Sequence, residues 1–177
     1  MSKCVFMYGR MNPPHNGHGK VFQQALNLKD DSTDVKLFLS SSCDSTKNPL
    51  PRDMRQYFIS RFFPDMKSTI QDVDVKNLFD IMTSLDGEYD EIIFVGGSDR
   101  AGDFQKTLDR YNGSLYNFKS IQTVLAGEDR TGCMYSSTLM RQSVQNGDFQ
   151  TFKICLPGDD EYLKYEMFCG VQTYMRK

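Results

Sequence analysis

Short apolar runs alternate along the chain with longer stretches in which apolar residues recur at helical spacing. The runs at 4–8, 35–39, 91–95 and 121–125 have the length and the apolar content that are typical of buried strands, and residues 73–75 predict a further short strand. Strand-like runs that alternate with helix-like stretches favour βαβ units and a parallel sheet.

The longer stretches predict helices. One helix is expected over 15–28, and Pro51 stands where a second helix begins. Further helices are expected at 78–85, 98–111 and 137–145, and most of 149–176 has helical spacing. We therefore predict an α/β fold, a Rossmann-like open parallel sheet with helices on both faces and a helical C-terminal segment. In sheets of this kind, ligands bind beyond the carboxyl ends of the strands.

A length of 177 residues predicts a single domain, 1–177. Lys and Arg number 21 against 23 Asp and Glu, and the resulting net charge of −2 disfavours a nucleic-acid binder. No apolar run approaches the roughly 20 residues of a membrane-spanning helix, so no membrane association is expected. The 5 cysteines are widely spaced and form no Cys-x-x-Cys pair, which favours reduced thiols in a cytoplasmic protein.

Both histidines of the chain, His15 and His18, follow the first predicted strand. Three residues apart at the start of a helix, their imidazoles share one face, and a helix N-terminus attracts anions. Gly17 lets a ligand approach the backbone between them. This combination suits a bound phosphate chain. Ordinary surface histidines are an alternative, and so is a metal site, although no Cys or carboxylate follows at a zinc-like spacing.

The string from Gly9 to His18, Gly-Arg-Met-Asn-Pro-Pro-His-Asn-Gly-His, resembles the HxGH signature of the nucleotidyltransferase superfamily of α/β-phosphodiesterases. Met11 stands where the family usually has Phe, so the position stays apolar. Residues 135–141, Tyr-Ser-Ser-Thr-Leu-Met-Arg, resemble the family's Ile-Ser-Ser-Thr-x-x-Arg motif. The two motifs lie in the expected order, and the resemblance spans about residues 5–141.

The second motif also has a physical reading of its own. Ser136 or Ser137 can cap a helix, and the hydroxyls of Ser137 and Thr138 can donate to phosphate oxygens. Arg141, one turn into the helix, can reach the same anion with a planar fork of donors. The competing interpretation is an ordinary capped helix with a solvated arginine, which the pairing with the HxGH string disfavours.

Two weaker strings fit the same scheme. Lys47 and Arg55 resemble the lysine-bearing loop and the following arginine helix of dinucleotide-forming adenylyltransferases, where cations could neutralise an acceptor phosphate. A solvated basic face is the alternative. The run from Gly96 to Asp99 resembles the family's Gly-x-Asp segment beside the nucleotide, or else Ser98 simply caps the next helix.

The resemblance implies roles for individual residues. It assigns catalysis to His15, His18 and Arg141, and the acceptor phosphate to Lys47 and Arg55. It assigns nucleotide contacts to Gly9, Arg10, Met11, Asn12, Gly17, Gly96, Gly97, Asp99, Ser136, Ser137 and Thr138. It implies no dedicated metal ligands, because Mg²⁺ would bridge phosphate oxygens of the triphosphate.

The implied reaction transfers a nucleotidyl group from a nucleoside triphosphate to a phosphorylated acceptor, with release of pyrophosphate. The spelling of residues 9–15 is most similar to adenylyltransferases of nicotinamide or nicotinate mononucleotide, which act in NAD biosynthesis. The chain lacks the Trp on which many of these enzymes stack the pyridine ring. The alternatives are a cytidylyltransferase of a phosphorylated alcohol and a non-catalytic nucleotide-binding module on the same fold.

Overall fold

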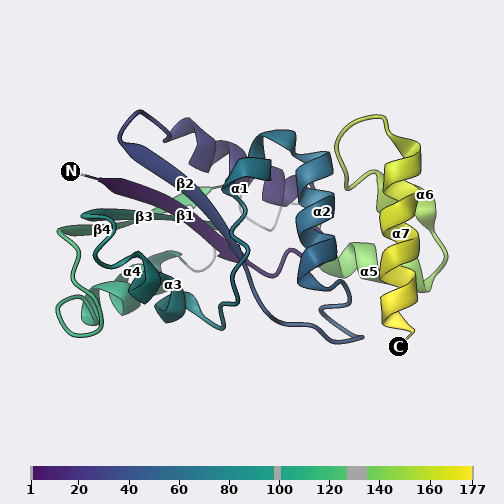
Figure 1. Ribbon diagram of the computed structural model, residues 1–177. Helices are drawn as coiled ribbons and strands as arrows, with labels where there is room; N and C mark the ends of the chain where they lie inside the picture. Colours follow the sequence, from purple (N-terminus) through teal and green to yellow (C-terminus); the bar gives the residue numbers. More distant parts are fainter. Residues whose placement is uncertain (1, 98–100, 127–134, 177) are drawn as a thin grey trace. The chain divides into compact units, whose positions relative to one another are not determined.

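The computed structural model of the protein describes residues 2–97, 101–126 and 135–176 (Figure 1). The chain divides into two compact units. Unit 1 comprises Met1–Gly9, Lys20–Ser40 and Thr69–Gly132, and unit 2 comprises Arg10–Gly19, Ser41–Ser68 and Cys133–Lys177. The chain enters unit 2 directly after the first strand, so the string with both histidines belongs to unit 2.

Unit 1 contains a parallel sheet of four strands in the order β2-β1-β3-β4. The strands are β1 (Lys3–Gly9), β2 (Thr33–Leu39), β3 (Glu91–Gly97) and β4 (Ser120–Ala126). The helices between them are α1 (Asn16–Asn27), α3 (Leu78–Leu85) and α4 (Ala101–Arg110). Each of the four longer strand predictions is confirmed within one or two residues at each end, and so is the predicted α/β parallel-sheet fold.

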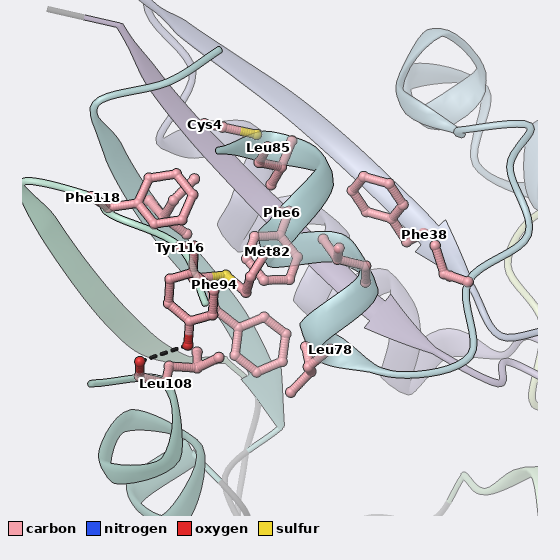
Figure 2. Packing of buried hydrophobic residues seen from close by; sticks show 13 residues of the cluster. Cys4, Phe6, Phe38, Leu78, Met82, Leu85, Phe94, Leu108, Tyr116 and Phe118 are labelled. Atoms are coloured by element: carbon pink, nitrogen blue, oxygen red, sulfur yellow. Dashed lines mark hydrogen bonds between the residues drawn. The ribbon is translucent and has the colours of Figure 1, made fainter. Parts of the chain in front are cut away.

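One face of the sheet carries an aromatic core (Figure 2). Phe6 of β1 is fully buried, with its ring centroid 6.2 Å from that of Phe38 and 5.0 Å from that of Phe94. Val5 and Met7, which point to the opposite face of the strand, are also fully buried. Both faces of β1 are therefore covered, as expected for the central position of a parallel sheet.

Neighbouring segments form hydrogen bonds with some of the otherwise unpaired backbone groups of the two edge strands, β4 and β2. The Gln105 side chain of α4 donates to the Ile121 carbonyl and accepts from the Thr123 amide, which covers part of the β4 edge. At the other edge, the Gln71 amide donates to the Leu37 carbonyl of β2.

The predicted short strand at 73–75 is wrong. This segment meets the β2 edge only at isolated bridges, Leu37 with Ile70 and Ser40 with Val75. The two bridges are separated by more residues in this segment (70–75) than on the β2 side (37–40), so the chain between them bulges away from the strand. Val73 is 45% exposed there, which shows that its side chain does not contribute to the core.

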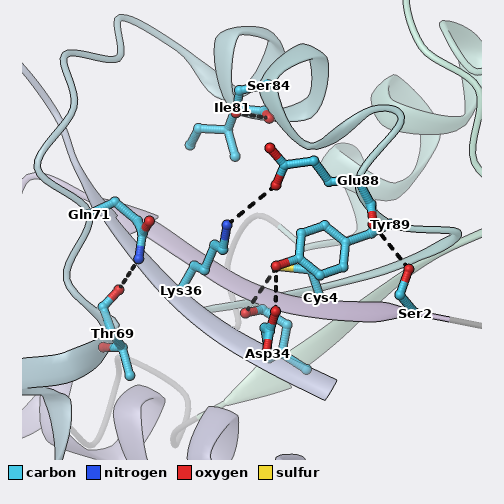
Figure 3. Close-up of polar contacts among 11 residues, drawn as sticks. Ser2, Cys4, Asp34, Lys36, Thr69, Gln71, Ile81, Ser84, Glu88 and Tyr89 are labelled. Carbon is cyan, nitrogen blue, oxygen red and sulfur yellow. Dashed lines mark hydrogen bonds and ion pairs between the residues drawn. The ribbon is translucent and has the colours of Figure 1, made fainter. Parts of the chain in front are cut away.

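Polar contacts between β2 and the turn before β3 are shown in Figure 3. Lys36 lies 3.7 Å from the Glu88 carboxylate, and the Tyr89 hydroxyl donates to Asp34. Burial of the neighbouring Cys4 raises the pKa of its thiol to about 12. Because only the thiolate is an effective nucleophile, Cys4 acts as an apolar core residue.

Unit 2 is helical. It contains α2 (Arg52–Phe62), α5 (Ser137–Gln145), α6 (Phe149–Lys153) and α7 (Glu161–Met175), and a 3-10 helix, η1 (Pro64–Thr69), follows α2. Each of the three C-terminal helices begins at an N-cap residue whose side chain accepts a backbone amide of the first turn. The N-cap residues are Ser136, Asp148 and Asp160. The predicted helix at 137–145 and the helical C-terminal segment are confirmed.

These helices share an apolar core of their own. It includes Phe58 of α2, Met140 of α5, Phe152 of α6 and Met167 of α7, all fully buried. Helices α2 and α7 approach closely at Gly170, where an added Cβ would lie 3.1 Å from the Met54 methyl carbon. In the described part of the chain, no helix is both long and apolar enough to span a bilayer.

Candidate active site

The candidate site of unit 2 begins with residues 10–15, which have neither helical nor strand structure. Arg10 is exposed, whereas Met11 to His15 are buried. Met11 has φ of +47°, in the left-handed region that costs roughly 1–2 kcal/mol for a residue with a Cβ. A conformation of this kind persists only where the surroundings determine it, so this segment is held by tertiary contacts.

The two histidines lie at the first turn of α1 with their ring centroids 3.9 Å apart. The Gly17 amide donates to Nδ1 of His15 at 2.9 Å, and the His15 amide donates to Nδ1 of His18 at 3.1 Å. A ring nitrogen that accepts an amide carries no proton, so each neutral imidazole has its proton on Nε2. Both rings therefore carry an Nε2–H group, a donor of the kind that can bind a phosphate oxygen.

Helix α1 is anchored at its first residue. The Asn16 amide donates to the Cys155 carbonyl at 2.8 Å, at the end of α6. One turn later, the ring of Phe63 packs on Gly19, where an added Cβ would lie 2.7 Å from Cε1 of Phe63. These contacts fix the turn that carries His18.

The Ser-Ser-Thr-x-x-Arg motif meets the histidine segment through two hydrogen bonds. The Ser137 hydroxyl donates to the Pro13 carbonyl at 2.8 Å, and Nη1 of Arg141 donates to the Asn12 carbonyl at 2.9 Å. Nη2 of Arg141 also donates to the Thr138 hydroxyl at 3.2 Å. The structure thus brings together the two motifs that lie more than a hundred residues apart in sequence.

The α5 N-terminus is capped by Ser136, whose hydroxyl accepts the Leu139 amide at 3.0 Å. Of the two serines that could cap this helix, Ser136 does so, while Ser137 holds the histidine segment. Partial burial of Arg141 lowers the pKa of its guanidinium, and the negative charge of Asp44 acts in the opposite direction. Since an arginine in a protein remains protonated, Arg141 supplies a positive charge beside the helix N-terminus.

Lys47 lies exposed in a tight loop organised by Asp44. The Asp44 carboxylate accepts the amides of Thr46 and Lys47 at 2.9 and 2.7 Å, and the Asn48 side chain at 2.6 Å. These hydrogen bonds stabilise the charged form and hold the pKa of this carboxyl well below its usual range. Sequence reasoning missed Asp44; an Asp four residues before Asn-Pro was the available signal for a side-chain-closed turn.

The loop of Lys47 is joined to the histidine segment at Leu50. The Asn12 side chain donates to the Leu50 carbonyl at 2.9 Å and accepts the Leu50 amide at 2.8 Å. Arg55 of α2 is fully buried, and its guanidinium donates to the carbonyls of Leu50 and Arg10 at 3.1 and 2.7 Å. The predicted contact of Arg55 with an acceptor phosphate stays a prediction.

Other predicted nucleotide contacts fall in unit 1. Gly96 and Gly97 are the last two residues of β3, and the Gly9 carbonyl at the end of β1 accepts the Ser40 amide. Asp99 and its neighbour Ser98 lie outside the described residues. Within the described residues, no three His, Cys, Asp or Glu side chains form a metal site.

No family model and no curated protein matches the chain. Among solved structures, it is similar to a Vibrio parahaemolyticus protein assigned as a nicotinate-nucleotide adenylyltransferase, with 19% identity and a TM-score of 0.62 over 96% of this chain and 99% of that one. It is also similar to a bifunctional NMN adenylyltransferase/ADP ribose pyrophosphatase from Francisella tularensis, with 17% identity and a TM-score of 0.61. That match covers 99% of this chain and 53% of the other, about half its length.

These likenesses show that the protein has the fold of such adenylyltransferases. They confirm, as a statement about fold, the resemblance predicted from the HxGH string. Since both identities are below 20%, the activity has to be argued from the residues of this chain.

The close packing of Phe63 on Gly19 predicts that Gly19→Ala destabilises the protein. The added Cβ should cost about 1–3 kcal/mol by overpacking, which outweighs the roughly 1 kcal/mol gained in helix propensity. Denaturant unfolding of Gly19→Ala, alone and with Phe63→Leu, measures this. We expect the loss to disappear in the Phe63→Leu background, and an equal loss in both backgrounds would contradict the account.

Proposed function

We propose that this protein transfers the adenylyl group of ATP to a nicotinamide or nicotinate mononucleotide, with release of pyrophosphate. The observation that carries the proposal is the set of donors in unit 2: two imidazoles with the proton on Nε2 follow a segment that Arg141 and Ser137, at the start of α5, hold by hydrogen bonds. These groups suit a chain of phosphates rather than a single carboxylate. The named activities of the two structural neighbours support the choice of substrates.

The chemistry needs no covalent enzyme intermediate. An oxygen of the acceptor's 5′-phosphate attacks the α-phosphorus of ATP, and the bond from that phosphorus to the bridging oxygen of the β-phosphate breaks. Pyrophosphate leaves with the electron pair. The attacking oxygen of a phosphate dianion is already unprotonated, so no general base is required, and catalysis consists of positioning and charge stabilisation.

We assign His15 and His18 to the α-phosphate, where charge develops during the attack. The Nε2–H groups are oriented in advance by the backbone amides on Nδ1, so little reorganisation is needed when substrate binds. Arg141, Thr138 and the amides of the α5 N-terminus would hold the β- and γ-phosphates and the departing pyrophosphate. The Ser137 hydroxyl donates to the Pro13 carbonyl, so Ser137 contributes through the backbone that it positions.

Lys47 is the cation that we place on the acceptor phosphate. It is exposed, and it lies in a loop that Asp44 closes and that Leu50 joins to the histidine segment. Mg²⁺ belongs to this scheme as a partner of the triphosphate, bound by phosphate oxygens and thus part of the substrate.

Replacing the histidines by Asn and by Gln separates their two functions. Asn keeps an acceptor near the position of Nδ1 but lacks a donor at Nε2, whereas the longer Gln can place an amide donor near Nε2. We expect His15→Asn and His18→Asn to lower turnover by about 100-fold, with melting temperatures near that of the wild type. The Gln variants should keep more activity than the Asn variants. Near wild-type rates in both Asn variants, with normal melting, would refute the catalytic assignment.

The acceptor is tested by pyrophosphate release and product analysis with ATP and each mononucleotide. We expect a dinucleotide to form, and Lys47→Ala to raise the KM of the acceptor while leaving the KM of ATP nearly unchanged, because only one substrate loses a contact. Lys67→Ala, an exposed lysine of η1, is the matched control and should behave as the wild type. If no dinucleotide forms but CTP or another acceptor supports turnover, the substrate assignment is wrong.

A further inference from the structure

Two side chains of the candidate site are placed to hold the backbone rather than a substrate. Asn12 is 2% exposed, and both atoms of its side-chain amide are used on the backbone of Leu50. Arg55 is fully buried and donates to two backbone carbonyls, one on each side of the same junction. Leu50 thus makes three hydrogen bonds with two side chains: its carbonyl accepts two, and its amide donates one.

We propose that Asn12 and Arg55 are positioning residues that fix the loop of Lys47 against the segment of the two histidines, and that neither touches a substrate. The proposal replaces the sequence-based assignment of Asn12 to the nucleotide and of Arg55 to the acceptor phosphate. Its kinetic consequence rests on the proposed adenylyl transfer, whereas its structural consequence does not.

Burial and hydrogen bonding argue against direct contact with a ligand. A phosphate could reach the fully buried Arg55 guanidinium only if the segments that cover it moved, and breaking its hydrogen bonds to the carbonyls of Leu50 and Arg10 would add to that cost. For Asn12, even the main-chain carbonyl is in use, since it accepts Nη1 of Arg141. The exposed cations Lys47 and Arg10 are the groups that a phosphate can reach without such losses.

The position of this junction explains why it matters for the reaction. Leu50 is three residues beyond Lys47, and His15 is three residues beyond Asn12, so the Asn12–Leu50 pair sets the separation of the two ligand-binding segments. An in-line attack needs the reacting atoms about 3–3.5 Å apart, and a displacement of roughly 1 Å can cost about 100-fold in rate. Loosening the junction should therefore lower kcat more than it weakens the binding of either substrate.

The chain offers a matched control for Asn12. Asn112 makes the same pair of hydrogen bonds in unit 1: its side chain donates to the Phe118 carbonyl at 3.0 Å and accepts the Phe118 amide at 2.9 Å. Asn12→Ala and Asn112→Ala therefore remove the same interactions, one pair at the candidate site and one in a loop that carries none of the proposed substrate contacts. Arg55→Lys has a control on the same helix, Arg61→Lys, which changes an exposed residue.

The first measurement is the steady-state kinetics of dinucleotide formation. For Asn12→Ala and Arg55→Lys we expect kcat to fall about 10- to 100-fold, with the KM of ATP changed by no more than about twofold, because Arg141 and the histidines remain. The two control variants should keep kcat within about twofold of the wild type. A normal kcat in Asn12→Ala and Arg55→Lys would overturn the proposal, and so would an equal loss in the controls.

The second measurement needs no substrate. Hydrogen exchange followed by NMR reports the Leu50 amide, which donates to Asn12. We expect this amide to exchange at least 10-fold faster in Asn12→Ala than in the wild type, and to be unaffected in Asn112→Ala. If Leu50 stays equally protected in Asn12→Ala, the positioning role is refuted whatever the kinetics show. If the wild type makes no dinucleotide, the proposed function fails, and this comparison still decides the positioning role.

Discussion

The site depends on one constraint: three backbone carbonyls between β1 and α1 have no helical or strand partners, and side chains satisfy them. The carbonyl of Arg10 accepts Arg55, that of Asn12 accepts Arg141, and that of Pro13 accepts Ser137. These donors come from parts of the chain that are between 45 and 129 residues away. The histidines therefore take their positions only when α2 and α5 are folded.

The same constraint explains why two polar residues of the Ser-Ser-Thr-x-x-Arg motif hydrogen-bond to the backbone. Ser137 and Arg141 would be read from sequence as phosphate ligands, yet both donate to the histidine segment. A guanidinium has five donors, so Arg141 can hold the Asn12 carbonyl and still bind an anion, whereas the single O–H of Ser137 cannot do both. The number of donors on each side chain therefore decides its role: Ser137 holds the backbone, and Arg141 can hold the backbone and bind an anion.

The sequence predicted the elements better than their contacts. The helix at 137–145 and the strands were readable because burial leaves a periodic apolar pattern. The segment 73–75 has two valines but no ladder, since strand pairing depends on a neighbour that a local pattern does not report. Likewise, the sequence placed Arg55 among the site residues, but tertiary packing buries its side chain, which donates to two backbone carbonyls. Asp44 was missed because it resembles the other polar residues of its loop.

The central claim is that backbone amides hold both imidazoles with the proton on Nε2, as donors to a phosphate chain. The chain has only 2 histidines, so ¹⁵N NMR of the imidazole nitrogens reports this site without interference from other rings. At a pH where both rings are neutral, the account predicts an unprotonated Nδ1 and a protonated Nε2 in both, and a change at both Nε2 resonances when a non-hydrolysable ATP analogue is added. A protonated Nδ1 in either ring, or no response to the analogue at Nε2, would contradict it.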